Sequence, residues 1–511
     1  MRFGVIPYKY IAILEILATE KILGKLQSFA SALFRTILLN PLCVEQIASV
    51  QVVQIGAKAI VGNFIRCGRI SSYIFTYKPN STMNRSAIKN FAIWARRYLR
   101  EQVTARATQY GITRNNIIEA QTVTGGLLVA GQTLDIESAK QYEQLWKHLQ
   151  DLMQVSRQPQ AVDALIDEIA YTWFNRLAAL RFMEVNGYIG RVLSSSDGSF
   201  VDPDILREAS SIAETGDLPS LDLATLDKWR KEANNDPNPD EFLYRRLLIA
   251  QCDALAPGIP ALFDPKKNYQ ALFLPGNLLN QDSIIRRLVK DIPEEDWQDI
   301  EVVGWLYQFY ISERKDEVIG AKSKVEAADI PAATQLFTPH WIVRYMVENS
   351  LGRLWLEAHP ESNLREFMPY YIENLNNEIT TPNSSLLTPN SLTPQELTVM
   401  DPACGSGHIL VYAFDLLFEI YKEQGYLERD IHALILTHNL HGLDIDERAA
   451  QLASFAVLMK ARAKNSRILR KPITLNITTV RPTHSQTLPP ADELNAKDWQ
   501  SLIEAFKDAD N

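Results

Sequence analysis

Hydrophobic positions recur with the period of an α-helix over a long stretch that begins near Asn84. Four of the first such positions are spaced i, i+4, i+7 and i+8, which places them on one helix face: Phe91, Ala95, Tyr98 and Leu99. The segment 162–183 is apolar on nearly every side and therefore predicts a buried helix. Further helices are predicted over 241–255 and 282–290. These patterns predict an α-helical domain over residues 83–330.

An aromatic-rich stretch lies near the end of this helical domain. Five large side chains occupy six consecutive positions: Trp305, Leu306, Tyr307, Phe309 and Tyr310. Aromatic side chains at such spacing belong more often to a core than to a ligand pocket, because they bury large apolar areas. We therefore predict that this stretch packs inside the protein.

The pattern changes to alternating strands and helices after a break at residues 359–396. The break is rich in Thr, Pro, Asn and Ser, and it predicts a flexible surface insertion. Strands are expected next at 397–401, 440–446 and 472–480, with helices between them at 408–421 and 447–463. This alternation predicts an α/β domain with a parallel sheet over residues 331–511.

The first 82 residues differ from the rest in their balance of basic and acidic residues. They hold nine Lys/Arg and three Asp/Glu, whereas residues 83–511 hold 43 and 58. Charged side chains interrupt every apolar run before it reaches the length of about 18 residues that a membrane span needs. A separate domain, a targeting sequence and translated upstream DNA are the three interpretations, and we favour the last. Residues 1–82 are thus expected to be an extension outside the native fold.

Composition places the chain among ordinary soluble proteins. Of the 511 residues 46% are hydrophobic and 22% are charged. The four cysteines lie far apart and form no Cys-x-x-Cys pair, which indicates a reducing, cytoplasmic setting. A net charge of −9 is unlike that of a general nucleic-acid binder, so any contact with DNA requires a local basic patch or a further part.

The turn after the first predicted strand carries the strongest chemical signal. It reads Asp401-Pro402-Ala403-Cys404-Gly405-Ser406-Gly407, and it leads directly into a helix. Glycines allow the backbone to approach a ligand, and the helix start presents N–H groups to it. Ligands of open α/β sheets bind at the carboxyl ends of the strands, where this turn lies.

An acidic residue, Asp444, ends the second predicted strand. A carboxylate at this point can accept both hydroxyls of a ribose. Asp446 is the alternative, although it can instead cap the helix that begins at Glu447. A dinucleotide site would want a third glycine near position 410, which is Leu410.

Two other groups of residues are weaker candidates for a functional site. His432, His438 and His441 lie close in sequence, but a zinc site would need them to converge with one more ligand. Cys404 and His408 are four residues apart, yet Cys404 lies inside the ligand-binding turn, where a wall residue is the better interpretation. We therefore assign no metal site and no catalytic residue.

Three segments resemble a known family, the adenine-specific (amino) DNA methyltransferases. The sequence DPACGSGHIL resembles their motif I, GLDID their motif II, and QLFTPHWIVRYMVENSLG (335–352) their motif X. The resemblance implies a Rossmann-like, class I fold that binds S-adenosylmethionine. It also implies which residues contact that cofactor: Phe337, Thr338, Asp401, Ala403, Gly405 and Asp444.

Three further segments, 170–188, 304–318 and 329–357, look like the large methyltransferase of BREX phage-defence systems, PglX-type. The resemblance covers about residues 83–480. It implies an adenine-specific methyltransferase acting on double-stranded DNA together with other defence subunits. The modification subunit of a restriction system, and a non-catalytic remnant that binds defence partners, are the rival interpretations.

The family's catalytic motif, Asn/Asp-Pro-Pro-aromatic, is absent from the sequence. There the polar side chain accepts protons of the adenine amine and the aromatic ring stacks on the flipped base. Leu488-Pro489-Pro490-Ala491 has the prolines alone, and we interpret it as a loop. Residues 331–511 are thus expected to form the first half of an incomplete methyltransferase domain, inactive alone and completed by a complementary C-terminal chain.

Overall fold

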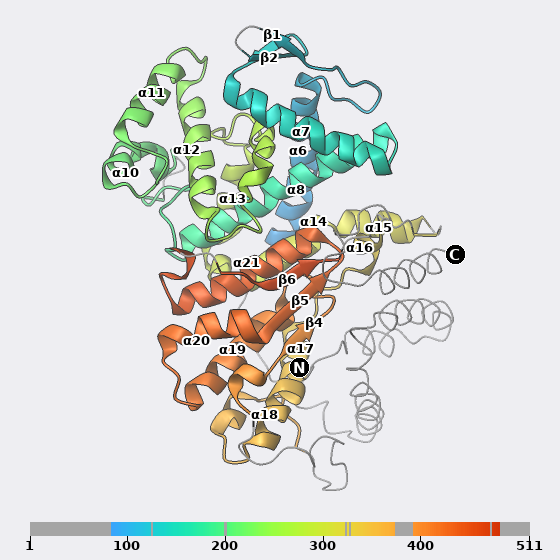
Figure 1. The fold of residues 1–511 in the computed structure, drawn as a ribbon, viewed down its shortest axis with the longest axis vertical. Helices are drawn as coiled ribbons and strands as arrows, with labels where there is room; N and C mark the ends of the chain where they lie inside the picture. Colours follow the sequence, from blue (N-terminus) through green and yellow to red (C-terminus); the bar gives the residue numbers. More distant parts are fainter. Residues whose placement is uncertain are drawn as a thin grey trace, which may run out of the picture.

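The computed structural model describes residues 83–480, apart from 124–125, 199–201, 322–323, 326–328, 374–391 and 471–472. The extension 1–82, most of the insertion and the Leu488–Ala491 segment lie outside the described residues. Figure 1 shows two stacked regions, a helical region (blue to yellow-green) above an α/β region (orange to red). Among the described residues, no helix combines the length and apolarity needed to cross a membrane.

Helix α8, Gln158–Val185, is the centre of the helical region. It buries side chains on every side along most of its length, as its all-round apolar sequence predicts. Helices α6 and α7 pack against it within the region, and α21 packs against it from the α/β region. The other helices are α6 (Arg85–Gln109), α7 (Ile136–Val155), α9 (Asp204–Arg207), α10 (Ala209–Thr215), α11 (Leu223–Ala233), α12 (Pro239–Leu255), α13 (Ile284–Asp291), α14 (Glu301–Tyr310), α15 (Ser312–Gly320) and α16 (Ile330–Thr334).

The predicted helices are confirmed in place and nearly in length. Helix α6 begins where the sequence indicates, because the Asn84 side chain accepts the backbone N–H of Ala87 and caps the helix. Within the aromatic-rich stretch Leu306, Tyr307 and Tyr310 are buried, which confirms the core prediction for them. Trp305 and Phe309 are only partly buried, so the core prediction holds in part for them.

The helical region also contains a small antiparallel sheet that the sequence pattern did not predict. Its strands are β1 (Gln121–Val123), β2 (Gly126–Val129) and β3 (Gln132–Leu134). The β2–β3 connection is a two-residue turn in which Ala130 and Gly131 have φ of 46° and 85°. Such turns usually have the sequence Asn-Gly or Asp-Gly, by which they are predicted. Here alanine occupies the first position, so the sequence did not predict the turn.

The α/β region has the predicted parallel sheet, in the order β4-β5-β6. Its strands are β4 (Val399–Asp401), β5 (Leu440–Asp444) and β6 (Asn476–Thr479), each shorter than expected. Helices α19 (His408–Glu423) and α21 (Glu447–Lys464) connect the strands, contact each other and pack on the sheet. The remaining helices are α17 (His340–Val347), α18 (Arg353–Ala358) and α20 (Glu428–Leu434). The described start of the insertion, 359–373, includes the 3₁₀ helix η6 (Asn363–Phe367), which buries Leu364.

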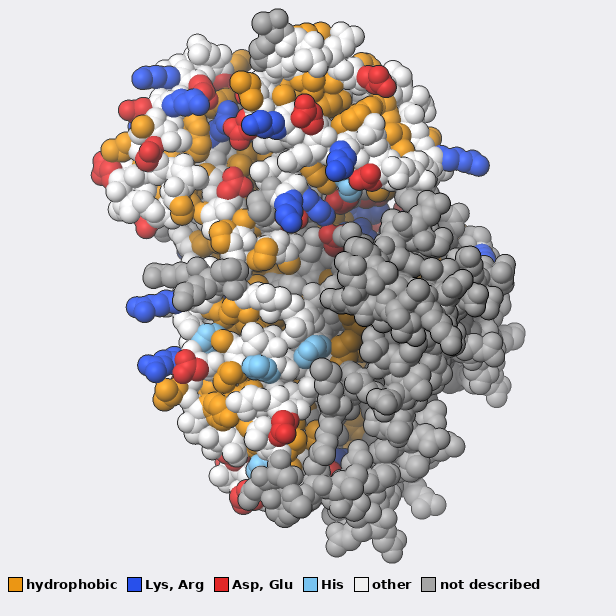
Figure 2. Space-filling model, viewed as in Figure 1, with side chains coloured by type: hydrophobic (Ala, Val, Ile, Leu, Met, Phe, Trp, Pro, Cys, Tyr) orange, Lys and Arg blue, Asp and Glu red, His pale blue; other side chains and the backbone are white. Residues whose placement is uncertain are grey.

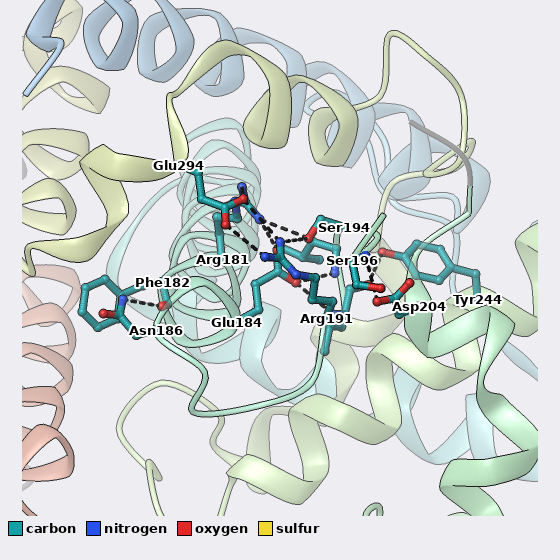
Figure 3. Close-up of polar contacts among 12 residues, drawn as sticks. Arg181, Phe182, Glu184, Asn186, Arg191, Ser194, Ser196, Asp204, Tyr244 and Glu294 are labelled. Carbon is teal, nitrogen blue, oxygen red and sulfur yellow. Dashed lines mark hydrogen bonds and ion pairs between the residues drawn. The ribbon is translucent and has the colours of Figure 1, made fainter. Parts of the chain in front are cut away.

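A buried ionic network fixes the C-terminal end of α8 (Figure 3). Glu184 is 0% exposed and lies 2.6 Å from the Arg181 guanidinium. Its other oxygen accepts the backbone N–H groups of Val192 and Leu193, both at 2.8 Å. Arg181 also bonds Glu294 at 3.1 Å. One carboxylate therefore joins the helix to the loop that follows it, and its guanidinium partner extends the link to residue 294.

Candidate functional site

The turn between β4 and α19 depends on its glycines. Gly405 and Gly407 have φ of 53° and 85°, a region that other L-residues rarely adopt. A Cβ at Gly407 would lie 2.9 Å from the Cα of Ala453, so α21 presses directly on the turn. The N–H of Cys404 donates to the carbonyl of Leu443 at 2.9 Å and ties the turn to β5. The turn is thus held at the carboxyl edge of the sheet.

Asp444 faces this turn from the end of β5. Its Oδ2 accepts the N–H of Gly405 at 2.7 Å, and its Oδ1 accepts the N–H of Asp446 at 2.8 Å. The side chain is half-buried and reachable from outside. These two backbone contacts hold the carboxylate at the end of β5, beside the glycine turn.

Asp446 caps a helix, which is one of the two roles that the sequence left open for it. It is 5% exposed and caps α21 by accepting the N–H of Arg448 at 3.0 Å. The Arg448 guanidinium donates two hydrogen bonds to the same carboxylate, at 2.8 and 3.0 Å. The Tyr307 hydroxyl donates to it at 3.1 Å, which links α14 to α21. Burial alone would lower the pKa of Arg448, but the Asp446 carboxylate outweighs it and raises that pKa.

Asp401 and Ala403 shape the turn from inside. Asp401 is 3% exposed, and its Oδ1 accepts the N–H of Ala403 at 3.1 Å. The carboxylate therefore organises the loop backbone instead of lying open at the surface. Ala403 and Gly405 are half-buried, with their backbone at the open edge of the sheet.

Phe337 and Thr338 reach the same turn from a distant part of the sequence. The Phe337 ring lies 4.1 Å from the ring of Trp305 and 4.1 Å from that of His408, the first residue of α19. The carbonyl of Thr338 is 3.2 Å from the Nδ1 of His408. The Thr338 hydroxyl is buried and has no hydrogen-bond partner within the described chain.

Sequence reasoning missed the residues of α14 that support this arrangement. A Cβ at Gly304 would lie 2.6 Å from the Phe337 ring and 3.1 Å from the Ser406 hydroxyl. Only glycine therefore permits this contact between α14 and both segments. The aromatic-rich stretch predicted that Trp305 packs inside the protein. Its spacing did not show which of its side chains would contact Phe337. Ile445 was also missed: it follows Asp444 and is 51% exposed.

The histidines considered as metal ligands have different surroundings in the structure. His432 is buried and pairs with Asn465, whereas His438 is exposed. Among the described residues, no group of three His, Cys, Asp or Glu side chains is placed to hold a metal ion. Cys404 is 2% exposed.

Comparison with known proteins matches the α/β region to a methylating family. Residues 383–511, about a quarter of the chain, match the family described as MmeI, DNA-methyltransferase domain. This segment begins before β4 and includes the glycine turn and Asp444.

Longer similarities extend over both regions. The chain is 44% identical over 411 residues to the adenine-specific methyltransferase BrxX of Escherichia coli O9:H4 (strain HS), covering 78% of this chain and 32% of that protein. It is 38% identical over 432 residues to the adenine-specific methyltransferase PglX of Lacticaseibacillus casei (strain Zhang), covering 78% and 34%. A putative type II restriction enzyme and methyltransferase of Methanocaldococcus jannaschii is 29% identical over 129 residues, 23% of this chain and 11% of its own.

The family resemblance stated from the sequence motifs is thereby confirmed. The chain spans about a third of the length of the two adenine-specific methyltransferases just named.

Proposed function

We propose that this chain provides the S-adenosylmethionine site of an adenine-specific DNA methyltransferase of the BREX type. The sheet β4-β5-β6 with α19 and α21 is then the first half of a Rossmann-like class I domain. The similarity to BrxX and PglX over 78% of the chain supports this proposal. The restriction-system alternative is supported over 23% of the chain only.

One observation carries the proposal. Three segments far apart in sequence meet at the carboxyl edge of the sheet, namely the Phe337–Thr338 segment, the glycine turn and Asp444. The Gly405 N–H bonds Asp444 at 2.7 Å, and the Thr338 carbonyl contacts His408 at 3.2 Å. Ligands of open α/β sheets bind at this edge. The meeting of the three segments is therefore what a cofactor site requires.

The residues present fit S-adenosylmethionine. Asp444 would hold the ribose hydroxyls, since its half-buried carboxylate ends β5 at the carboxyl edge of the sheet and is a hydrogen-bond acceptor. The backbone of Ala403 and Gly405 lies at the open edge, where the turn would receive the methionyl group. The buried Thr338 hydroxyl, which has no partner among the described residues, would gain one from the ligand. When bound, the cofactor supplies an activated methyl group on its sulfonium.

The transfer itself needs groups that this sequence does not contain. The only Pro-Pro pair, Pro489-Pro490, lacks the flanking polar and aromatic residues that would bind a flipped adenine. On the face seen in Figure 2, Lys and Arg are interspersed with Asp and Glu over the described surface, without a single-sign patch. Double-stranded DNA is thus proposed as the substrate of an assembly that includes a complementary C-terminal part or other defence subunits.

Calorimetry with S-adenosylmethionine and NAD tests the cofactor assignment. We expect this chain to bind S-adenosylmethionine in preference to NAD. Asp444→Ala should weaken that binding by about 1–3 kcal/mol, roughly fivefold to 150-fold, because it removes a charged hydrogen-bond acceptor. Asp430→Ala, which removes an exposed aspartate on α20, is the matched control and should leave the affinity unchanged. Tighter binding of NAD, or equal affinity in the Asp444 and Asp430 variants, would refute the assignment.

A further inference from the structure

One face of α14 contacts the segments that form the proposed cofactor site. Figure 1 shows this helix at the junction of the helical and α/β regions. Glu301, Gly304 and Trp305 are spaced i, i+3 and i+4, which places them on the same side of the helix. The sequence motifs did not assign any of the three to cofactor binding, yet each reaches a segment that meets at the carboxyl edge of the sheet.

The ring of Phe337 contacts both α14 and α19. Its centroid lies 4.1 Å from that of the Trp305 ring and 4.1 Å from that of the His408 ring. It also comes so close to Gly304 that an added Cβ would lie 2.6 Å from it. Aromatic rings at such distances are packed against each other. Phe337 therefore cannot shift without displacing side chains of α14 or α19.

Trp305 is held in turn by the helical region. The Arg85 guanidinium on α6 lies 4.2 Å from the centroid of the Trp305 ring, within the range of a cation–π contact. The Phe309 ring, one turn further along α14, lies 5.5 Å from it. Helices α6 and α14 also pack closely against each other. The helical region therefore sets the position of the ring that Phe337 contacts.

His408 anchors the next residue of the same segment. Its Nδ1 is 3.2 Å from the carbonyl of Thr338 and donates to it when that nitrogen carries the proton. Its Nε2 is 4.0 Å from the Glu301 carboxylate on α14. The Thr338 side chain is 7% exposed, and its hydroxyl is buried without a partner among the described residues. Contacts on the Phe337 ring and on the Thr338 carbonyl together fix where this hydroxyl lies.

We propose that Trp305 is a positioning residue for the S-adenosylmethionine site, acting through Phe337 on the place of the Thr338 hydroxyl. This inference rests on the proposed function of the site. It gives the helical region a part in cofactor binding, although the match to the methylating family begins only at residue 383. Asp444 is held by backbone N–H groups of the α/β region, so the effect falls on the Phe337–Thr338 side of the site.

Calorimetry on variants of Trp305 tests this role. Trp305→Leu should weaken S-adenosylmethionine binding about tenfold, as expected when one hydrogen bond to the ligand is lost. Trp305→Phe keeps a ring beside Phe337 and should bind within about threefold of the original chain. Trp94→Leu is the matched control, because Trp94 is also partly buried, with the Arg287 guanidinium 3.9 Å and the Tyr98 ring 4.8 Å from its ring. Unchanged affinity in Trp305→Leu, or an equal loss in Trp94→Leu, would overturn the proposal.

Gly304→Ala tests the same contact without removing a large side chain, and it decides if Trp305→Leu does not fold. Alanine favours a helix more than glycine does, but its Cβ would force the Phe337 ring away from α14. Affinity for S-adenosylmethionine should fall about tenfold. Gly320→Ala on α15, where nothing lies within 4 Å of the added Cβ, should leave it unchanged. Equal affinity in the two glycine variants contradicts the proposal.

Amide hydrogen exchange separates this inference from the proposed function, because it needs no cofactor. Peptides that cover residues 335–347 should exchange faster in Trp305→Leu than in the original chain or in Trp94→Leu. Unchanged exchange there refutes the inference even if the chain binds S-adenosylmethionine. If the original chain binds none, the proposed function fails, and the exchange measurement alone decides whether Trp305 holds the segment in place.

Discussion

Two carboxylates, one in each region, are held in a similar way and differ in access. Glu184 in the helical region accepts two backbone N–H groups at 2.8 Å, and Asp444 in the α/β region accepts two at 2.7 and 2.8 Å. Glu184 is 0% exposed and ion-paired to Arg181, whereas Asp444 is half-buried at the open edge of the sheet. The same hydrogen-bond pattern therefore occurs once in the buried core and once at the edge of the sheet, where we propose that the cofactor binds.

The difference follows from what surrounds each group. Residues 192–193 wrap back over the end of α8 and seal Glu184, so a ligand could reach it only if the fold opened (Figure 3). Asp444 is followed by Ile445, whose apolar surface is exposed beside it. We expect substitutions at Glu184 to change stability and those at Asp444 to change ligand binding.

The largest effect is expected from Glu184→Ala. The substitution removes one of the two carboxylates that pair with the Arg181 guanidinium, which is 1% exposed, and keeps only Glu294. It also leaves two buried backbone N–H groups without their acceptor. Breaking a buried ion pair in this way costs about 3–5 kcal/mol. Thermal and urea denaturation should show the loss, with Glu214→Ala on the surface of α10 as control. A loss no greater than that of Asp444→Ala would contradict the comparison of the two carboxylates.

A smaller but still substantial loss is expected from Gly407→Ala. The residue has φ of 85°, and its Cβ would lie 2.9 Å from the α21 backbone. Backbone strain of this kind costs about 1–3 kcal/mol. Gly425→Ala, also at positive φ but with nothing within 4 Å of the added Cβ, isolates the close contact from the strain. The melting temperature should fall further for Gly407→Ala, and affinity for S-adenosylmethionine should fall with it. Equal losses would show that α21 does not press on the turn.

The comparison also shows what the sequence could predict. The order of strands and helices followed from hydrophobic period, and the glycine turn and Asp444 followed from local motifs. The sequence did not decide the role of Asp446, because a carboxylate just before a helix can either cap that helix or bind a ligand. The contact of Gly304 with Phe337 could not be predicted, since it joins two segments whose meeting depends on the packing of whole helices. The β2–β3 hairpin was missed because Ala130 adopts a conformation that usually marks glycine or asparagine.

Acid should weaken the ion pairs that Glu168 on α8 makes with His148 and Lys267. Burial by itself would raise the pKa of Glu168, but hydrogen bonding and charge from His148, together with Lys267, outweigh it and lower the pKa from 4.5 to about 2. A lowered carboxylate pKa stabilises the folded state above the unfolded value and loses that contribution as pH falls toward the folded value. The contribution of Glu168 should therefore be complete above about pH 4.5 and decline between there and pH 2.

Melting temperatures of the original chain and of Glu168→Gln, compared from pH 7 to pH 3.5, measure this contribution. The original chain should be the more stable above pH 4.5, by on the order of 2 kcal/mol, and the gap should narrow below it. A gap that stays constant as pH falls would contradict the lowered pKa.

The smallest effect is expected from Tyr307→Phe, which removes the hydroxyl that joins α14 to Asp446. Asp446 keeps its helix cap and both contacts from Arg448, so the carboxylate is not left without partners. The loss should therefore be that of one hydrogen bond, about 0.5–1.5 kcal/mol. Because Asp446 lies two residues from Asp444, the same variant reports whether the helical region positions the ligand-binding edge. Calorimetry should show affinity for S-adenosylmethionine within about threefold of the original, since Asp444 is held by backbone N–H groups of its own region. A tenfold loss of affinity, with little loss of stability, would show that the helical region controls that site.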